Sequence, residues 1–278
     1  MTTGSALALC ARQELVLAVR SRWTQLFAAV FGVLALTVAT SGYILSGGHG
    51  VQDFARTAAS LVQLVLLLVP VTALLIGVLA LAPDRGAAEL LYSQPVARRT
   101  ILMGKVLGLL AALVGAEAFG FGAAGVVIFS QSGNEGLGGF LLLQVCAFVL
   151  TAVFLALAAL IAAGSTGRRT RALALALVTW FVAVVLFDIG ILGVASLLRS
   201  GPASRLLIVG TLANPVDAVR TAALLGIQGT TAFGPASLAL VRFSHGPMGA
   251  GVLLAGSLLL WLVGPLVWAA RRLSRADL

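Results

Sequence analysis

The stretch LVQLVLLLVPVTALLIGVLALA, residues 61–82, contains no charged residue. About 20 apolar residues in helical conformation cross the roughly 30 Å of hydrocarbon in a bilayer. Backbone polar groups inside a bilayer must be satisfied within the segment, and this run lacks the alternation of a barrel strand. The stretch therefore predicts a transmembrane helix, in which Pro70 removes one backbone hydrogen bond and introduces a kink.

Similar apolar runs recur along the chain. Of its 278 residues, 60% are hydrophobic and 10% are charged, whereas soluble domains carry about 25% charged residues. We therefore predict an all-α polytopic membrane protein, a single domain over residues 1–278. Its six spans are expected at 23–45, 61–82, 101–130, 138–163, 172–197 and 250–270. Residues 5–21 mix apolar and basic side chains, which favours a helix lying in the membrane interface.

The net charge of +9 is distributed by side of the membrane rather than along a nucleic-acid-binding face. With the N-terminus inside, the outer segments hold only Arg56, Arg199, Arg205, Arg220 and Arg242. The inner segments hold Arg12, Arg20, Arg22, Arg85, Arg98, Arg99, Lys105, Arg168, Arg169, Arg171, Arg271, Arg272 and Arg275. Cytoplasmic loops are enriched in Lys and Arg. The pattern predicts an inner-membrane protein with both termini in the cytoplasm.

Two connections carry structure of their own. PDRGAAELLYSQPVARR, residues 83–99, predicts a short cytoplasmic helix that begins at Asp84 and ends before Pro95. The outer loop 198–249 is too long to lack structure. Within it, NPVDAVR, residues 214–220, predicts a helix with Asn214 as N-cap, Pro215 and Asp217 in the first turn, and an end near Gly226. Residues 204–213 and 233–247 are expected to add further apolar and helical segments to this outer cap.

Two acids, Glu117 and Asp188, lie inside predicted spans at similar depth. An ionisable residue within a membrane span is by default a functional hypothesis. The pair could share an interior cavity, line a pathway, or be held by structural hydrogen bonds. The centres of the two spans contain no basic residue to pair with them.

Other motifs are weaker. The chain has no phosphate-binding G-x-x-x-x-G-K-[ST] motif, HExxH or G-x-S-x-G, so we expect no catalytic set. GFGAAG, residues 120–125, indicates close helix packing. GKVLG, residues 104–108, indicates a helix contact or a dimer seam. Cys10 and Cys146 are not expected to meet. His245 and Met248 offer two soft ligands, too few for a confident copper site.

Several of these stretches together resemble a known family. LLYSQPVARRTILMGKVLG, residues 90–108, and the six-span pattern are similar to ABC-2 type permeases, the membrane subunits of ABC exporters. TWFVAVVLFDIGILG, residues 179–193, and NPVDAVR are similar to the branch of that family that serves nitrous oxide reductase maturation.

The resemblance implies a set of partners and contact residues. A separate ATPase subunit would bind ATP and Mg and contact the coupling helix, so no cofactor is expected in this chain. The implied coupling residues are Asp84, Arg85, Glu89, Tyr92, Arg98 and Arg99. A second permease copy would form a homodimer within the lipid bilayer. A periplasmic copper-related protein would contact the outer cap at Asn214, Pro215, Asp217 and Arg220.

Two alternatives remain open on the residues alone. One is a general ABC-2 exporter of a drug, lipid or peptide. The other is a proton-coupled secondary transporter that uses Glu117 and Asp188.

Overall fold

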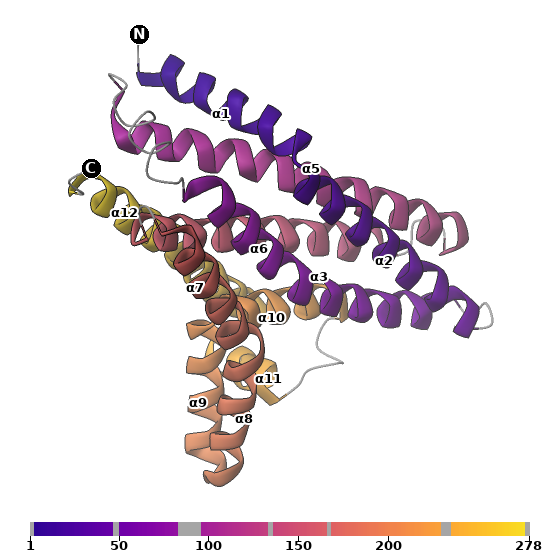
Figure 1. The fold of residues 1–278 in the computed structure, drawn as a ribbon. Helices are drawn as coiled ribbons and strands as arrows, with labels where there is room; N and C mark the ends of the chain where they lie inside the picture. Colours follow the sequence, from indigo (N-terminus) through magenta and orange to yellow (C-terminus); the bar gives the residue numbers. More distant parts are fainter. Residues whose placement is uncertain are drawn as a thin grey trace.

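A computed structural model of the chain describes residues 3–46, 50–82, 96–132, 136–165, 168–228 and 235–275. Within these ranges the chain is helical and contains no strand. Six helical segments of the described part are long and apolar enough to cross a membrane. They confirm the six predicted spans, with ends that differ by a few residues (Figure 1).

The helices follow one another along the chain with short connections. In order they are α1 Thr3–Arg20, α2 Arg22–Ser46, α3 Gly50–Leu81, α5 Arg98–Ser132, α6 Leu137–Ala163, α7 Arg169–Phe181, the π-helical turn η1 Val182–Leu186, α8 Phe187–Leu197, α9 Ser200–Ala213, α10 Pro215–Gln228, α11 Pro235–Phe243 and α12 Pro247–Arg275. Because α7, η1 and α8 are continuous, they form the fifth span together.

The core of the bundle lies between α2, α3, α5 and α6. A chain of aromatic contacts crosses it, because the ring of Phe121 lies 5.3 Å from that of Phe31 and 5.7 Å from that of Phe140. Gly120 makes room for this chain, since a Cβ there would lie 2.5 Å from the ring of Phe31. The close-packing interpretation of GFGAAG is therefore confirmed at Gly120. Helices in lipid associate through such small residues.

The N-terminal helix α1 packs along the first half of α5 (Figure 1). Gly104 and Gly108 of α5 form the contact surface: a Cβ on Gly104 would lie 2.5 Å from Cβ of Cys10, and one on Gly108 would lie 2.8 Å from Cβ of Glu14. Helix α1 therefore covers both glycines of the GKVLG motif. Of the two interpretations of this motif, the structure supports a helix contact within the chain rather than a dimer seam.

Between these two glycines, Lys105 crosses from α5 to its neighbours. Its ammonium group lies 2.7 Å from a carboxylate oxygen of Glu14 on α1 and donates to the carbonyl of Ala80 on α3, at 3.2 Å. The single lysine of the chain therefore joins three helices close to where α3 ends.

One end of the bundle, which we name the basic end, holds the starts of α1, α5 and α7 and the ends of α3, α6 and α12. Arg98 at the start of α5 donates to the carbonyl of Leu273 on α12, and Arg169 at the start of α7 donates to that of Leu79 on α3, both at 3.3 Å. The N-terminal helix α1 starts at the same end, because its residues Leu7, Cys10 and Ala11 lie beside Gly104 near the start of α5. The two termini accordingly lie on one side of the molecule (Figure 1).

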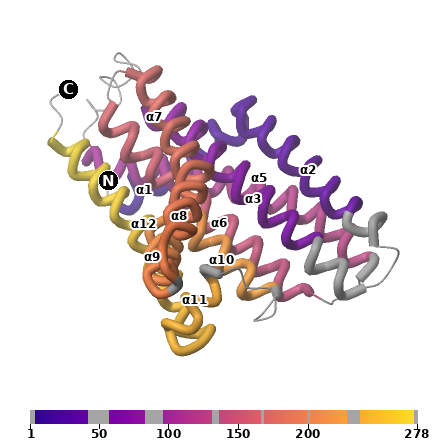
Figure 2. Tube along the Cα trace, turned by 90° about the horizontal axis from the view of Figure 1, so that it is seen from below, coloured from indigo at the N-terminus to yellow at the C-terminus, as the bar shows by residue number. Residues whose placement is uncertain are grey.

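The segment predicted as an outer cap contains three helices, α9, α10 and α11 (Figure 2). The helix predicted from NPVDAVR is confirmed as α10, although it continues two residues past Gly226. Gly226 is a packing position rather than a stop, because a Cβ there would overlap Leu142 at the start of α6. Helix α10 is not an exposed lid: it packs against α3, α6, α9 and α12.

Candidate functional site

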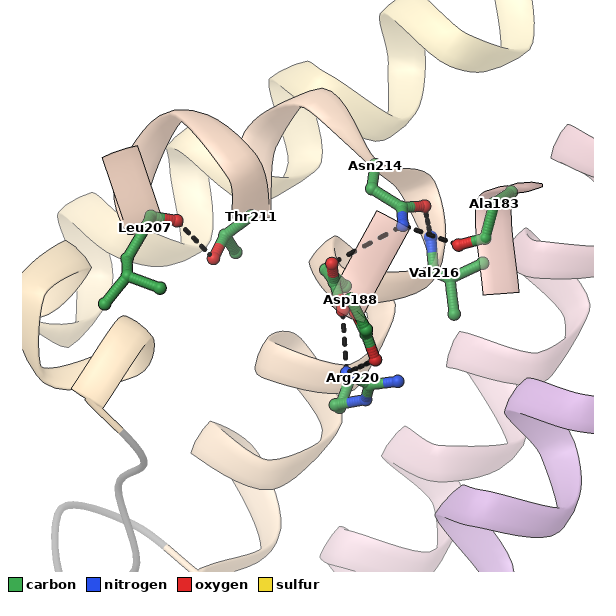
Figure 3. A network of polar contacts seen from close by, with 8 residues as sticks. Ala183, Asp188, Leu207, Thr211, Asn214, Val216 and Arg220 are labelled. Carbon is green, nitrogen blue, oxygen red and sulfur yellow. Dashed lines mark hydrogen bonds and ion pairs between the residues drawn. The ribbon is translucent and has the colours of Figure 1, made fainter. Parts of the chain in front are cut away.

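The fifth span contains an irregular turn, η1, which lies next to the start of α10 in space. The turn η1 is π-helical, with the Phe187 amide donating to the carbonyl of Val182, five residues back. Single π turns inside α-helices are rare and often occur at functional sites. The amide nitrogen of Asn214 donates to the carbonyl of Ala183 within this turn, at 2.7 Å (Figure 3). The start of α10 is therefore attached to the irregular turn of span five.

Asn214 performs two tasks with one side chain. Its Oδ1 accepts a hydrogen bond from the amide of Val216 at 3.0 Å, which is the N-cap interaction predicted from the sequence. Its Nδ2 supplies the bond to Ala183 and a longer one, 3.4 Å, to Asp217. Asn214 is buried, so these hydrogen bonds are shielded from solvent.

Six residues after Asn214, nearly two helical turns along α10, Arg220 pairs with two carboxylates. Its Nη1 lies 2.7 Å from Oδ2 of Asp188 on α8 (Figure 3), and 2.8 Å from Oδ1 of Asp217 on α10. The three side chains are between 15% and 27% exposed, so water screens the ion pairs only in part. We name Asp188, Asn214, Asp217 and Arg220 the polar latch, because they attach α10 to span five.

The carboxyl group of Asp217 binds its proton more tightly than an ordinary aspartate does. Burial raises the pKa of Asp217 from 3.8 to about 7, the neighbouring Asp188 contributes in the same direction, and Arg220 opposes it. Two carboxyl groups that share one guanidinium ion do not ionise independently. Burial and Asp188 therefore both favour the protonated form of Asp217 within the latch.

A cavity of about 430 Å³ opens beside the latch, between α8, α9, α10 and α11. Asp188, Asp217 and Arg220 form its charged wall. The rest of the lining is mainly apolar, with Ile191 and Leu207 among it. The cavity can thus hold a small solute between apolar side chains and three charged groups.

The second intramembrane acid lies in other surroundings. Glu117 on α5 is buried and accepts a hydrogen bond from the hydroxyl of Thr151 on α6. It is absent from the lining of the cavity beside Asp188. The structure therefore does not place Glu117 and Asp188 in one cavity, and Glu117 matches the expectation of structural hydrogen bonding.

The predicted coupling residues are described only in part. Asp84, Arg85, Glu89 and Tyr92 lie outside the described residues. Arg98 and Arg99 form the first turn of α5, where Arg98 is half-buried against α12 and Arg99 is exposed at the basic end. Their contact with an ATPase stays a prediction.

The predicted cap residues lie inside the fold. Asn214 and Pro215 are buried, and Asp217 and Arg220 face span five rather than the outside. Their contact with an external protein stays a prediction, and the structure gives them an internal role that the sequence interpretation did not include.

The weak metal ligands do not gain a third partner. Both side chains are exposed: His245 lies in the turn between α11 and α12, and Met248 lies in the first turn of α12. The described residues contain no group of three or more His, Cys, Asp or Glu side chains that could hold a metal ion. Cys10 and Cys146 are free thiols on α1 and α6.

The pairing of Asp188 with Arg220 was missed because Arg220 was counted with an outer loop. One signal was available: a carboxylate within a span needs a partner, and it faces the interior of a bundle. The spacing of Asp217 and Arg220 already placed an acid and a base on one face of the predicted α10. The π turn has no recognisable sequence signal.

Known proteins resemble this chain over most of its length. The family model described as ABC-2 family transporter protein matches residues 8–278. A probable ABC transporter permease protein NosY from Pseudomonas aeruginosa is 32% identical over 235 residues, which cover 82% of this chain and 85% of that protein. A protein of the same name from Stutzerimonas stutzeri is 34% identical over the same shares.

Proposed function

The chain belongs to the ABC-2 family of transporter permeases, and from this premise we propose that it carries ATP-driven motion from the basic end to the polar latch. A separate ATPase subunit binds ATP and Mg and contacts residues 84–99. The observation that carries the proposal is the attachment of α10 to span five by Asn214 and Arg220. A movement of span five must move α10, or else break a partly buried ion pair.

The contacts between the helices supply a route for the motion. Lys105 joins α5, α1 and α3 beside the connection that would bind the ATPase. Helix α3 also packs against α7, the first part of span five. From there the π turn leads to the latch and its cavity. Packed helices shift as rigid elements, so force applied to α3 and α5 reaches α10 through side-chain contacts.

The finer assignment is maturation of the copper centre of nitrous oxide reductase. It is supported by the similarity to two proteins named NosY, which extends over 82% of the chain. In this role the chain forms a homodimer in the inner membrane, with both termini in the cytoplasm. A periplasmic copper-related protein receives the motion of the cap. The concentration of basic residues at the end that holds both termini supports this orientation.

A secondary transporter driven by protons has less support. That mechanism required Glu117 and Asp188 to act together, whereas Glu117 bonds to Thr151 and Asp188 pairs with Arg220. Membership of the ABC-2 family supports a partner subunit as the energy source instead.

The ATPase contact can be tested by charge reversal at the basic end. We expect the double variant Arg98→Glu and Arg99→Glu to lose the co-purifying ATPase from a tagged full-length chain in gentle detergent. Arg205→Glu, an exposed arginine of α9 away from that end, is the matched control and should keep the ATPase. Equal recovery of the ATPase by both variants would refute the proposed contact.

The role of the latch is tested in cells that lack the native chain. Arg220→Met should leave the ATPase bound but lower the copper content of nitrous oxide reductase. Arg242→Met, at an exposed arginine of α11, should leave that copper content unchanged. Asp188→Asn, which keeps an acceptor oxygen for Arg220, should have the smaller effect. A general exporter would be indicated by two results together. The chain would co-purify with the ATPase but without a periplasmic protein, and the copper content of the reductase would stay normal in Arg220→Met.

A further inference from the structure

A groove of about 500 Å³ lies at the basic end between the start of α5 and the end of α12. Three arginines line it: Arg98 and Arg99 from α5, and Arg271 from α12. Met103, Val267 and Ala270 supply apolar lining from the same two helices. The groove is therefore amphipathic, and it is formed by the terminal turns of two membrane spans.

The charged and apolar parts of the groove are ordered along the axes of α5 and α12. On α5, Met103 follows Arg99 by four residues, and on α12, Val267 precedes Arg271 by four. At 1.5 Å per residue, each apolar side chain lies about 6 Å from its arginine along the helix axis. Because α5 enters the membrane after Arg98 and α12 leaves it before Arg275, both offsets point toward the hydrocarbon.

The guanidinium groups favour an anion at the outer rim of the groove. Arg98 is fixed in place by its bond to the carbonyl of Leu273. Arg99 and Arg271 are exposed, and no ion pair in the described part of the chain includes either of them. Their positive charge adds to that of the α5 N-terminus. Guanidinium groups bind phosphate oxygens through paired hydrogen bonds.

We propose that this groove binds an anionic phospholipid, with its phosphate among Arg98, Arg99 and Arg271 and an acyl chain along Met103, Val267 and Ala270. Basic pockets between spans on the cytoplasmic side recognise such headgroups. The neighbouring part of α12 fits the same depth. There Arg272 lies over the ring of Trp268, at 5.0 Å, and tryptophan is enriched at the membrane interface.

The site shares Arg98 and Arg99 with the proposed ATPase contact, whereas Arg271 belongs to α12 and lies outside residues 84–99. Substitution of Arg271 therefore separates lipid binding from coupling. Val267→Trp distinguishes lipid binding in the groove from attraction to surface charge in general. The substitution replaces the exposed Val267 with a side chain that fills the apolar part of the groove, and it leaves all three arginines in place.

Native mass spectrometry of the full-length chain, with any subunit that co-purifies, measures the binding directly. We expect phosphatidylglycerol to bind more tightly than phosphatidylcholine with the same acyl chains. Arg271→Gln should weaken phosphatidylglycerol binding about fivefold, which corresponds to the usual contribution of one basic residue near a membrane surface. Val267→Trp should weaken it as well. Arg205→Gln on α9 is the matched control and should leave it unchanged.

Three results would overturn the proposal. The first is equal binding of the two lipids. The second is an equal loss in Arg205→Gln, which would indicate diffuse charge attraction. The third is displacement of the lipid by inorganic phosphate at matching concentration, with no effect of Val267→Trp, which would indicate a free-anion site without an acyl chain.

Discussion

The carboxyl group of Asp217 couples the latch to pH. In the folded chain its pKa is about 7, compared with 3.8 for an ordinary aspartate, so the folded state binds the proton more tightly than the unfolded state. The stability that results is present at acidic pH and is lost as the pH rises through about 7. Arg220 and Asp188 are the charged groups that face this carboxyl.

Asp217→Asn should flatten this pH dependence. We expect the melting temperature of the detergent-solubilised chain to fall between about pH 6 and pH 8, and to fall less in the variant, because asparagine does not ionise. Differential scanning fluorimetry at both pH values measures the two slopes. Identical slopes in the two proteins would mean that Asp217 already carries its charge at pH 6.

Glu117 accepts a hydrogen bond from Thr151 and is buried in the bundle. Glu117→Gln keeps the shape and an acceptor oxygen for Thr151, so we expect little loss of stability. Thr151→Val leaves the buried carboxyl without its donor and should cost about 1–3 kcal/mol of unfolding free energy. Thermal unfolding compares the two variants; a larger loss in Glu117→Gln would show that Glu117 needs its charge.

The residue scale is also where the sequence predicted least. Asn214 could be recognised as an N-cap because its position before Pro215 is local information. Its bond to Ala183 could not, since the two residues are 31 positions apart and nothing in the sequence marks the intervening π turn. Arg220 was likewise assigned to an outside surface, and only the fold brings it to Asp188.

At the scale of elements, the contact between α1 and α5 depends on the absence of two side chains. Gly104→Leu and Gly108→Leu each place a side chain where backbone and Cβ atoms of α1 already lie. We expect α1 to detach locally or the chain to lose about 1–3 kcal/mol. Hydrogen exchange of residues 3–20 measures the detachment.

Gly115 provides the matched control for this prediction. It lies on the same helix, and a Cβ at that position would meet nothing within 4 Å. Gly115→Leu should therefore leave hydrogen exchange of α1 unchanged. Faster exchange in all three variants would show that leucine disturbs α5 itself rather than the α1 contact.

The elements themselves were predictable because their signal is a long apolar run. All six spans were placed correctly, and helix ends vary by one or two residues with any criterion. The depth of α10 was not predictable. Its 14 residues are too short to cross a bilayer, so the sequence placed it outside, whereas packing at Gly226 and Asn214 draws it among the spans.

At the scale of the whole molecule, the location of both termini at the basic end predicts the orientation of every span. A green fluorescent protein fused to the C-terminal end should fluoresce, because it folds in the cytoplasm. Alkaline phosphatase inserted after His245, between α11 and α12, should be active, because it requires the periplasm. The opposite pair of results would invert the topology and remove the ATPase from the basic end.

The π turn gives the fifth span a tolerance for a change in length. A π turn holds about one residue more than an α-helical turn, so a residue deleted from Val182–Leu186 would return the helix to an α-helical course and leave the faces beyond it nearly in place. Asp188 would still face Arg220, and the contact that the deletion disturbs is the bond from Asn214 to the carbonyl of Ala183. Lineages that lack one residue in this segment should therefore keep the pair of Asp188 and Arg220.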